Sequence, residues 1–572
     1  SARYYADTDV ALALKLGDGD WPIEAELTGT SNGSQLSAKL AAQTLDLVDS
    51  GGLTFDAGLA NPAAWVLLGQ AGLPTIPIDA DDDAGLTLHV EQPSGGDPQV
   101  NVSFTSQTTE VTLTGQTALD SGHFLNGSYA FKVDSGDLGP YLMMNGITLP
   151  RLADQGLPFV MSASVYTTPE AIALESITGN SDDNGFSGTL SIDRKQAVPM
   201  FAGEVKMNSA DLMWLAEAVY GQVTDPVSAG LSRQPIPKLT GLPAAADVSL
   251  EIDRFRLGTL GVVDGFRGRM NADPGRIALS GATGQFETGH FKGNVELGNT
   301  DGNAFFRARI GVTGAALKTP FWLHAGKPVA SAKSDLSLVI DATGTSPHGM
   351  LETATGSGRL SLANVEINGL DRKALAEILA GVDTIATEVS ETQVAPLVEK
   401  ALFDGTLKLA RLDIPFAITG AKLRADKVAS TVKPSYGLSD DQIAGMLKDG
   451  FASADADIRL NGAGTLGLED AMLDATLETT FIAGDQAVTG AEPTVALHWQ
   501  GAFAAPKRSL DVTQITSFLS LRKFEQERRR VEILQANMQE KQRLRRESAL
   551  YRAREAERQR LRQKILDDAR LL

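Results

Sequence analysis

Alternation of apolar and polar residues recurs along most of the chain, and it constrains the fold more than any other feature. A β-strand turns successive side chains to opposite faces, so a period of two predicts strands with one apolar and one polar face. Clusters such as "SNGS" and "NSDDNG" punctuate the runs and are typical of hairpin turns. The pattern predicts a mostly β protein built on an elongated, curled antiparallel sheet.

The apolar positions of these runs are the candidate functional residues. We expect them to line up along one face of the sheet and to form an apolar groove that an acyl chain can enter. The groove candidates are Val10, Leu12, Leu14, Val100, Val102, Phe104, Val111, Leu113, Leu190, Ile192, Val248, Leu250, Ile252, Leu336, Leu338 and Ile340. The same alternation also fits a sheet whose apolar face is packed dry against a second layer, and both readings stay open.

A repeat lies within the alternating region. A Thr-Gly pair that closes one strand is followed by a Gly-Phe-like entry into the next, as in Thr178-Gly179 before "GFSG" and Thr283-Gly284 before "GHFKG". Thr114-Gly115 before "GHFLNG" is a further copy. The copies are unevenly spaced, which favours an elongating sheet over a closed propeller with fixed blades.

Short segments with helical capping residues interrupt the strands, and we expect crossover helices between successive blocks of sheet. Several begin at Asn, Ser or Thr and stop at Gly, which are typical N-cap and C-cap residues. These segments lie near residue 60 and begin at Ser135, Asn208, Thr313 and Asn368. Two more helices are predicted over residues 384–403 and 439–451, the second opening with a capping box.

The pattern changes at about Val512. From there to residue 572 the chain contains no Pro or Gly and is rich in Arg, Glu and Gln, which predicts one long charged helix. We therefore expect three parts: repeated β-groove blocks over 1–330, a C-terminal β region with short helices over 331–511, and the helix over 512–572.

Charge also separates the tail from the body. The chain holds 51 Lys and Arg against 71 Asp and Glu, a net charge of −20. Residues 521–572 hold 16 of the former and 9 of the latter, or +7, which leaves −27 for the rest. Such an acidic body argues against nucleic acid as a partner. In the tail, Arg528, Arg529 and Arg530 are candidate contacts with an anionic membrane or a partner helix, and a solvated helix without a partner stays open.

Residues that could perform catalysis or bind metal are scattered. The six His residues never form a close pair in sequence. The "NSDDNG" segment resembles the first half of a calcium loop, but Ser191 stands where such a loop needs Glu, so a hairpin turn is favoured. The acidic run at residues 79–83 is interpreted as a solvated loop. Hydrolase, P-loop and zincin motifs are absent, so we expect no enzyme, cofactor or metal.

The sequence gives two indications about compartment. It contains no Cys, which suits an oxidising compartment, and no run of about 20 apolar residues that could span a bilayer. It begins "SARYYADTDV", without Met, so we expect a processed product or part of a longer protein whose membrane anchor lies upstream.

Residues 356–477 carry a family resemblance. The segments "GSGRLSLANVEINGLDRKALAEIL", "DGTLKLARLDIPFAITGAKLRADKVAST" and "ADADIRLNGAGTLGLEDAMLDATLE" resemble the C-terminal region of the AsmA-like periplasmic proteins, relatives of TamB. The run "GAFAAPKRSLDVTQITSFLSLRKFEQERRRVE" is similar to the ending of alphaproteobacterial members. The resemblance implies a long curled sheet with an apolar concave face, attached to the inner membrane and acting in outer-membrane lipid homeostasis. It brings no catalytic motif.

The expected function is transfer of phospholipid or another acyl lipid through the periplasm, without catalysis. An acyl chain of about 16 carbons crossing water would expose surface costing roughly 13 kcal/mol, at about 0.8 kcal/mol per CH₂. About 35 stacked strands would extend the groove on the order of 170 Å. Expected partners are the inner membrane and outer-membrane or helical proteins at the tail. The alternative is a structural or adhesive β-solenoid with a dry core and no lipid.

Overall fold

The fold is described from a computed structural model of the chain. The described residues are 4–44, 52–73, 75–78, 83–118, 126–145, 156–193, 195, 198–228, 230–238, 245–318, 322–324, 326–386, 388–430 and 458–570. The predicted helix over 439–451, His123 and most of the acidic run at 79–83 fall outside these residues.

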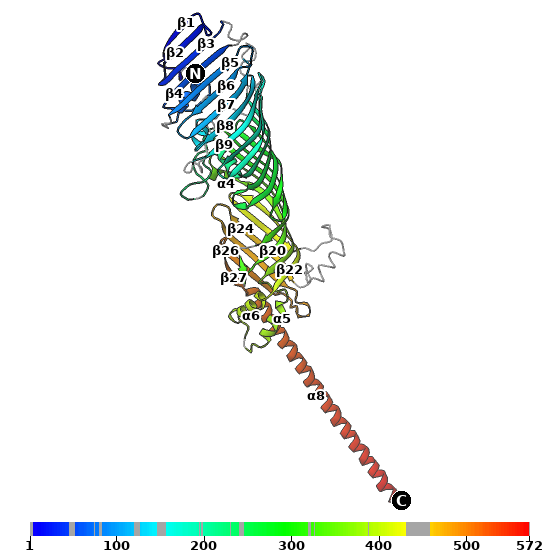
Figure 1. Cartoon of the computed structure of the whole chain (residues 1–572). Helices are drawn as coiled ribbons and strands as arrows, with labels where there is room; N and C mark the ends of the chain where they lie inside the picture. The colour runs from blue at the N-terminus through cyan, green and yellow to red at the C-terminus, as the bar shows by residue number, and fades with distance from the viewer. Residues whose placement is uncertain are drawn as a thin grey trace.

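One sheet of 25 strands dominates the molecule and confirms the predicted mostly β, elongated fold (Figure 1). Its strands are β1 (Asp9–Leu16), β2 (Ile23–Ser31), β3 (Ser34–Ala42), β4 (Leu53–Asn61), β5 (Ala84–Gln92), β6 (Gln99–Thr105), β7 (Thr109–Thr117), β8 (Gly127–Ser135), β9 (Phe159–Thr167), β10 (Ala171–Ser181), β11 (Asn184–Asp193), β12 (Met200–Asp211), β13 (Ala245–Arg256), β14 (Val262–Asp273), β15 (Arg276–Phe286), β16 (Gly289–Thr300), β17 (Asn303–Lys318), β20 (Ala330–Gly344), β21 (Thr355–Asn368), β22 (Thr406–Thr419), β23 (Lys422–Ser430), β24 (Ile458–Gly467), β25 (Met472–Phe481), β26 (Thr494–Ala502) and β27 (Lys507–Asp511). A separate two-stranded ribbon pairs β18 (Leu323–His324) with β19 (Lys327–Pro328).

The strands follow one another in the sheet in chain order. Each strand pairs antiparallel with its predecessor except β13, which runs parallel to β12. The first strand, β1, pairs with β2 and the last, β27, pairs with β26, so the sheet has two free edges and is not closed. Among the described residues the sheet has 25 strands, fewer than the 35 expected, and the longest of them, β17, has 16 residues. It extends roughly 115 Å at about 4.8 Å per strand.

Helices gather along one margin of this sheet. Strand ends form two long margins, and the one at which β4, β8, β12, β21 and β27 end is called the helix margin below. The helices are α1 (Ala64–Gln70), α2 (Gly139–Met144), α3 (Leu212–Tyr220), α4 (Pro347–Thr353), α5 (Ala374–Asp383), α6 (Glu391–Phe403) and α8 (Thr513–Ala569), with single 3₁₀ turns at Gly258–Leu260 and Gly484–Gln486. In the described part of the chain, every α-helix except α4 lies in or after a connection that leaves a strand at the helix margin.

Helical segments are confirmed near residue 60 and after Ser135, Asn208 and Asn368, whereas the helix expected from Thr313 is wrong. Strand β17 continues through that position and pairs with β20 as far as Lys318. A bulge between Val312 and Ala315 absorbs the Gly there, since Gly314 takes a positive φ of 72°. The capping pattern therefore marked a bulge in a long strand. Of the predicted helix over 384–403, the second part is helical, as α6.

Helix α3 begins the connection that returns the chain across the sheet between β12 and β13. Because β12 and β13 are parallel, the chain must return from the helix margin to the opposite margin between them. The helix is N-capped by Asp211, whose Oδ1 accepts the Met213 N–H at 2.8 Å. Its buried residues Val219 and Tyr220 belong to the same core cluster as Phe266 and Leu279. Helix α3 therefore covers the apolar face in the middle of the molecule.

Tyr220 fastens the end of this helix. Its hydroxyl donates to the Phe305 carbonyl at 2.5 Å, and burial raises the pKa of Tyr220. Replacing it with Phe should cost about 1 kcal/mol in the free energy of unfolding, because one hydrogen bond is lost.

The same variant should alter the alkaline response. A raised folded pKa means that the hydroxyl stabilises the protein below the unfolded pKa of about 10 and loses this contribution as pH rises further. Urea midpoints from pH 8 to 11 should therefore fall more steeply in the wild type than in Tyr220→Phe. Parallel curves would contradict a buried, hydrogen-bonded hydroxyl.

Helix α8 closes one end of the sheet and then leaves it. Ile515, Phe518 and Leu519 are fully buried in a cluster with α5 and α6, whereas the residues from Phe524 onward project away from the sheet (Figure 1). At 57 residues the helix is roughly 85 Å long. The long charged helix predicted from Val512 is confirmed, while the three-part division of the chain stays a prediction.

Candidate functional site

The register of the sheet joins its apolar side chains into one continuous surface. Residues paired across neighbouring strands point to the same face, so a chain of pairs can be followed from strand to strand. We call the following chain of pairs the central row: Leu14, Ala25, Leu40, Phe55, Val90, Val100, Gly115, Tyr129, Val165, Leu174, Leu190, Gly203, Val248, Met270, Leu279, Val295, Ala308, Ile340, Gly356, Ile418, Leu423, Leu466, Leu473 and Gly501. The row runs from β1 to β26 without a charged residue.

All of the predicted groove residues lie on the face of the central row, here called the inner face. Five of them are in the row itself, and the others occupy rows two or four residues away along the same strands. Val102, for example, lies between Leu88 and Leu113, and Leu338 lies between Ile310 and Gly358. Whether these side chains contact lipid stays a prediction.

Exposure of the inner face changes along the sheet. At the free edge, Leu12 and Leu14 are 69% and 65% exposed. Leu113, Leu190 and Leu338 are half-buried, as expected of a curled sheet whose neighbours shade one another. Val248 and Ile252 fall to 4% and 2%, and Ile252 lies in the cluster that α3 joins. The inner face is thus accessible at the β1 edge, whereas the predicted groove residues Val100 and Phe104 are 3% and 7% exposed, and Phe104 packs with α1 and α2. Helices also cover it in the middle and at the C-terminal end.

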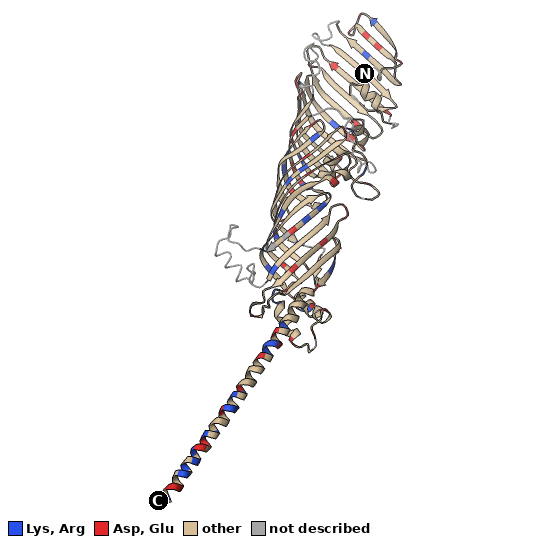
Figure 2. Ribbon diagram, turned by 180° about the vertical axis from the view of Figure 1, so that it is seen from behind, with Lys and Arg blue, Asp and Glu red and all other residues tan. Residues whose placement is uncertain are grey.

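Ion pairs that join neighbouring strands lie on the opposite face, and Figure 2 shows Lys, Arg, Asp and Glu positions along many of these strands. Lys206, Glu251 and Arg267 form one cross-strand group, with Lys206 to Glu251 at 3.1 Å and Arg267 to Glu251 at 2.7 Å. Hydrogen bonds from Arg267 and then Lys206 hold the pKa of Glu251 below its usual range. Arg276, Glu296, Arg307 and Asp341 form a second group. This outer face is therefore suited to water, and the inner face is not.

The Thr-Gly repeat has a structural cause. In the clearest copies the Gly lies on the inner face directly opposite the Phe of the next strand, as Gly179 lies opposite Phe186 and Gly284 opposite Phe291. A Cβ on Gly179 would overlap the Phe186 ring. The repeat is a cross-strand Gly-Phe pair on the inner face, but the ring contacts differ: the Phe186 ring covers the backbone of Gly179, whereas the Phe291 ring lies against Gly293 on its own strand.

The segment that resembles a calcium loop is a two-residue hairpin between β10 and β11, as favoured. Asp182 takes a positive φ of 51° in the turn. The Asn184 side chain is occupied by the neighbouring strand, accepting from the Ser209 N–H at 2.8 Å and donating to its carbonyl at 2.9 Å. Across the part of the chain that the structure describes, no group of three His, Asp or Glu residues is arranged to hold a metal ion.

The candidate contacts in the tail lie on the projecting part of α8. Arg528, Arg529 and Arg530 are exposed, and each is within 3.5–3.8 Å of a Glu on its own helix. These pairs partly neutralise the positive patch, so its role at a membrane or partner stays a prediction. Among the described helices, none is both long and apolar enough to span a bilayer.

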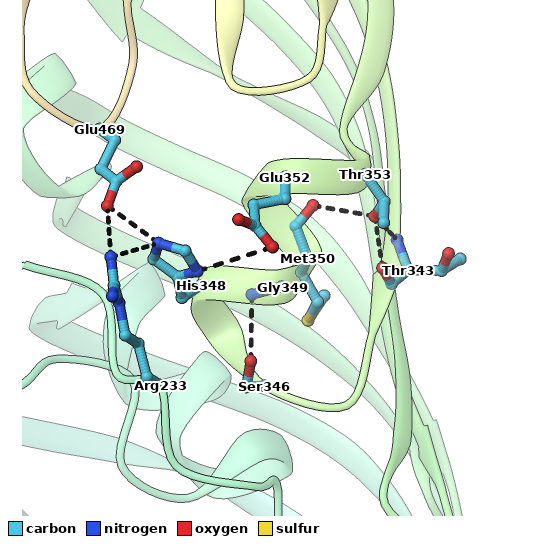
Figure 3. A network of polar contacts seen from close by, with 9 residues as sticks. All are labelled: Arg233, Thr343, Ser346, His348, Gly349, Met350, Glu352, Thr353 and Glu469. Atoms are coloured by element: carbon cyan, nitrogen blue, oxygen red, sulfur yellow. Dashed lines mark hydrogen bonds and ion pairs between the residues drawn. The ribbon is translucent and has the colours of Figure 1, made fainter.

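A polar cluster that the sequence analysis did not predict lies at the margin opposite the helix margin (Figure 3). It joins the segment around Arg233, helix α4 and the turn after β24. Glu469, in the turn after β24, accepts from Arg233 at 3.0 Å and lies 2.9 Å from Nε2 of His348 on α4. Glu352 lies 3.8 Å from Nδ1 of His348. The hydrogen bonds from His348 and then Arg233 hold the pKa of Glu469 below its usual range. We call these four residues the margin clasp.

The margin clasp should stabilise only the segments that it joins. Glu469→Gln should increase hydrogen exchange in the turn at 467–471 and in the segment around Arg233. We expect little change in global unfolding, because the side chains of Arg233, Glu352 and Glu469 are at least half-exposed. Since the pKa of Glu469 is lowered, the wild-type clasp should loosen only as pH falls below about 4. Glu492→Gln, which removes the exposed Arg459 pair at 2.6 Å, is the matched control and should leave the turn unchanged.

Comparisons with known proteins find one family model that matches part of the chain. A family model described as the AsmA family matches residues 222–411, from the segment after α3 into β22. Short segments are similar to proteins described as chaperone protein HscA homologs: 48% identical over 68 residues in Paracidovorax citrulli, 56% over 45 in Janthinobacterium sp., and 34% over 126 in Acidovorax sp. strain JS42. These segments cover 12%, 8% and 22% of this chain and 10%, 7% and 18% of those proteins. No solved structure matches significantly.

Proposed function

Because residues 222–411 make this chain an AsmA-like protein, we propose that it is a non-enzymatic carrier that moves acyl lipids along its inner face between the inner and outer membranes. The single observation that supports this most is the central row, which offers apolar or Gly residues on successive strands from β1 to β26. A lipid tail moving along such a row would avoid most of the cost of meeting water, about 0.8 kcal/mol per CH₂.

The geometry supports movement along the sheet rather than storage in one pocket. Leu12 and Leu14 at the free edge are mostly exposed, so a chain could enter there without unfolding the sheet. Charged groups are concentrated on the outer face, where they leave the inner path unobstructed. We place the protein in the periplasm, with an inner-membrane anchor upstream, in keeping with the envelope association of its family.

One observation favours the alternative, a structural β-solenoid without cargo. The C-terminal core around α5, α6 and α8 is sealed, with Leu402, Ile515 and Phe518 at 0% exposure. In the carrier, that part would be the closed end of the path or would have to open. In a solenoid, the exposed edge at Leu12 and Leu14 would be a protein contact instead.

Purification in mild detergent followed by native mass spectrometry separates the two functions. The carrier should retain acyl lipids, which organic extraction releases and identifies. A protein that carries no lipid and does not take up phospholipid from vesicles would overturn the proposal in favour of the solenoid.

A further inference from the structure

A cavity lies where the sheet rolls back on itself near its C-terminal end. The connection between β17 and β20 reaches the turn between β26 and β27, where Trp322 Nε1 donates to the Phe503 carbonyl at 2.6 Å. The two rings are 5.3 Å apart. Beside this contact is a cavity of about 370 Å³, within the usual range for ligand sites. Its apolar lining includes Ile367, Leu477, Leu497 and Trp499.

One positively charged side chain, that of Arg508 on the edge strand β27, lies at this apolar surface. Arg508 is paired with Trp499 across β26 and β27, so it points to the inner face and lines the cavity. Its guanidinium carbon lies 3.7 Å from the centre of the Phe403 ring. Stacking on a ring face fixes the plane of the guanidinium but leaves the N–H groups around its rim available. Among the described residues, Arg508 forms no ion pair within 4.0 Å.

We propose that this cavity is a binding site for the head of an anionic phospholipid, with its phosphate on Arg508 and the first part of its acyl chains among Leu477, Leu497 and Trp499. The inference rests on the proposed function and names the class of lipid and the place where it stops. A planar guanidinium offers paired donors to phosphate oxygens. Indole rings prefer boundaries between polar heads and apolar chains, which Trp322 and Trp499 provide.

The position explains why a head group would stop here. The central row offers no charged partner from β1 to β26, so a phosphate travelling along it finds no ion pair until it reaches Arg508 on β27. The neighbouring Lys507 pairs with Gln500 and points to the outer face. The two adjacent residues therefore provide a matched test, since one faces the cavity and the other faces water.

The test uses the full chain and phosphatidylglycerol with brominated acyl chains, which quench nearby Trp fluorescence. We expect quenching in the wild type, at least tenfold weaker binding in Arg508→Glu, an intermediate effect in Arg508→Gln, and wild-type binding in Lys507→Glu. Trp499→Phe should reduce the quenching amplitude more than the affinity. Uncharged brominated diacylglycerol should bind weakly and equally to the wild type and both Arg508 variants.

Three controls fix the interpretation. Circular dichroism and the thermal midpoint of Arg508→Gln establish that the sheet is intact. Glycerol phosphate and inorganic phosphate are added as competitors, and displacement of lipid by inorganic phosphate at equal concentration would overturn a lipid site in favour of a free-phosphate site. Wild-type lipid content by native mass spectrometry tests the proposed function separately. If lipid is retained but Arg508→Glu binds phosphatidylglycerol normally, this inference fails and the carrier function stands.

Discussion

Leu113→Arg should stop lipid transfer while leaving the sheet folded. Leu113 is half-buried on the inner face, between Val102 and Phe131 in the neighbouring strands. An arginine beside an acyl chain costs about 2.5–3.5 kcal/mol, and each 1.4 kcal/mol is a factor of ten. We therefore expect transfer of phosphatidylglycerol between vesicles to slow roughly 50-fold or more.

The matched control for this block is Thr114→Arg. Thr114 is the next residue on β7 and is exposed on the outer face, so the same charge added there should leave transfer unchanged. Normal transfer by Leu113→Arg would show that β7 does not line the path. Leu250→Arg is a second blocking test on a half-buried position, whereas Ile252→Arg is unsuitable because Ile252 is 2% exposed beneath α3 and a charge there would disrupt folding.

Removing Asp383 should release the base of α8. Arg522 is almost fully buried and donates to both Asp383 oxygens, at 2.7 and 3.2 Å, and to Gln486 Oε1 at 2.9 Å. Asp383→Ala leaves this buried charge with one neutral partner. Breaking a fully buried pair costs about 3–5 kcal/mol, and because Asp383 is half-exposed we expect about 2 kcal/mol for opening of α8. Hydrogen exchange of residues 515–522 measures it.

The control for Asp383→Ala is Arg522→Met, which keeps the length of the side chain and removes the buried charge. It leaves a solvated carboxylate, so we expect a cost below about 1 kcal/mol. A larger loss in Arg522→Met than in Asp383→Ala would contradict this account.

Low pH should weaken the ion pair between Arg522 and Asp383. The hydrogen bonds from Arg522 hold the pKa of Asp383 below its usual range. The contribution of the pair is therefore complete above the unfolded pKa of about 3.9 and is lost as pH falls below it. Exchange at 515–522 should stay constant from pH 8 to 5 after correction for intrinsic rates, then rise below about pH 4 in the wild type and less in Asp383→Ala.

The sequence predicted the features that repeat locally. Alternation at Val100, Val102 and Phe104 specifies which side chains share a face, and the hairpin turns fix the register so that every candidate falls on the inner face. Helix α4 was missed although Ser346 and Pro347 carry an N-cap signal, with the Gly349 N–H donating to Ser346 Oγ at 3.0 Å. The alternating pattern of the flanking strands β20 and β21 concealed the N-cap signal of α4.

Contacts between distant segments could not be predicted in this way. Arg233 and Glu469 are 236 residues apart, and Trp322 and the Phe503 carbonyl are 181 residues apart. No local period specifies such partners, because they depend on how far the sheet twists and rolls. The single parallel pairing of β12 with β13 is equally hidden in the sequence, since hairpin signals surround it on both sides.

That one parallel step decides where the chain ends. In an antiparallel meander each strand reverses direction, and an odd number of strands that starts at one margin must finish at the other. The sheet has 25 strands, and β1 starts at the helix margin. Because β12 and β13 run in the same direction, one reversal is missing. Strand β27 therefore also finishes at the helix margin, beside α5 and α6. Without the α3 return, the C-terminal rod would emerge from the far side, away from α5 and α6, against which its first three turns pack.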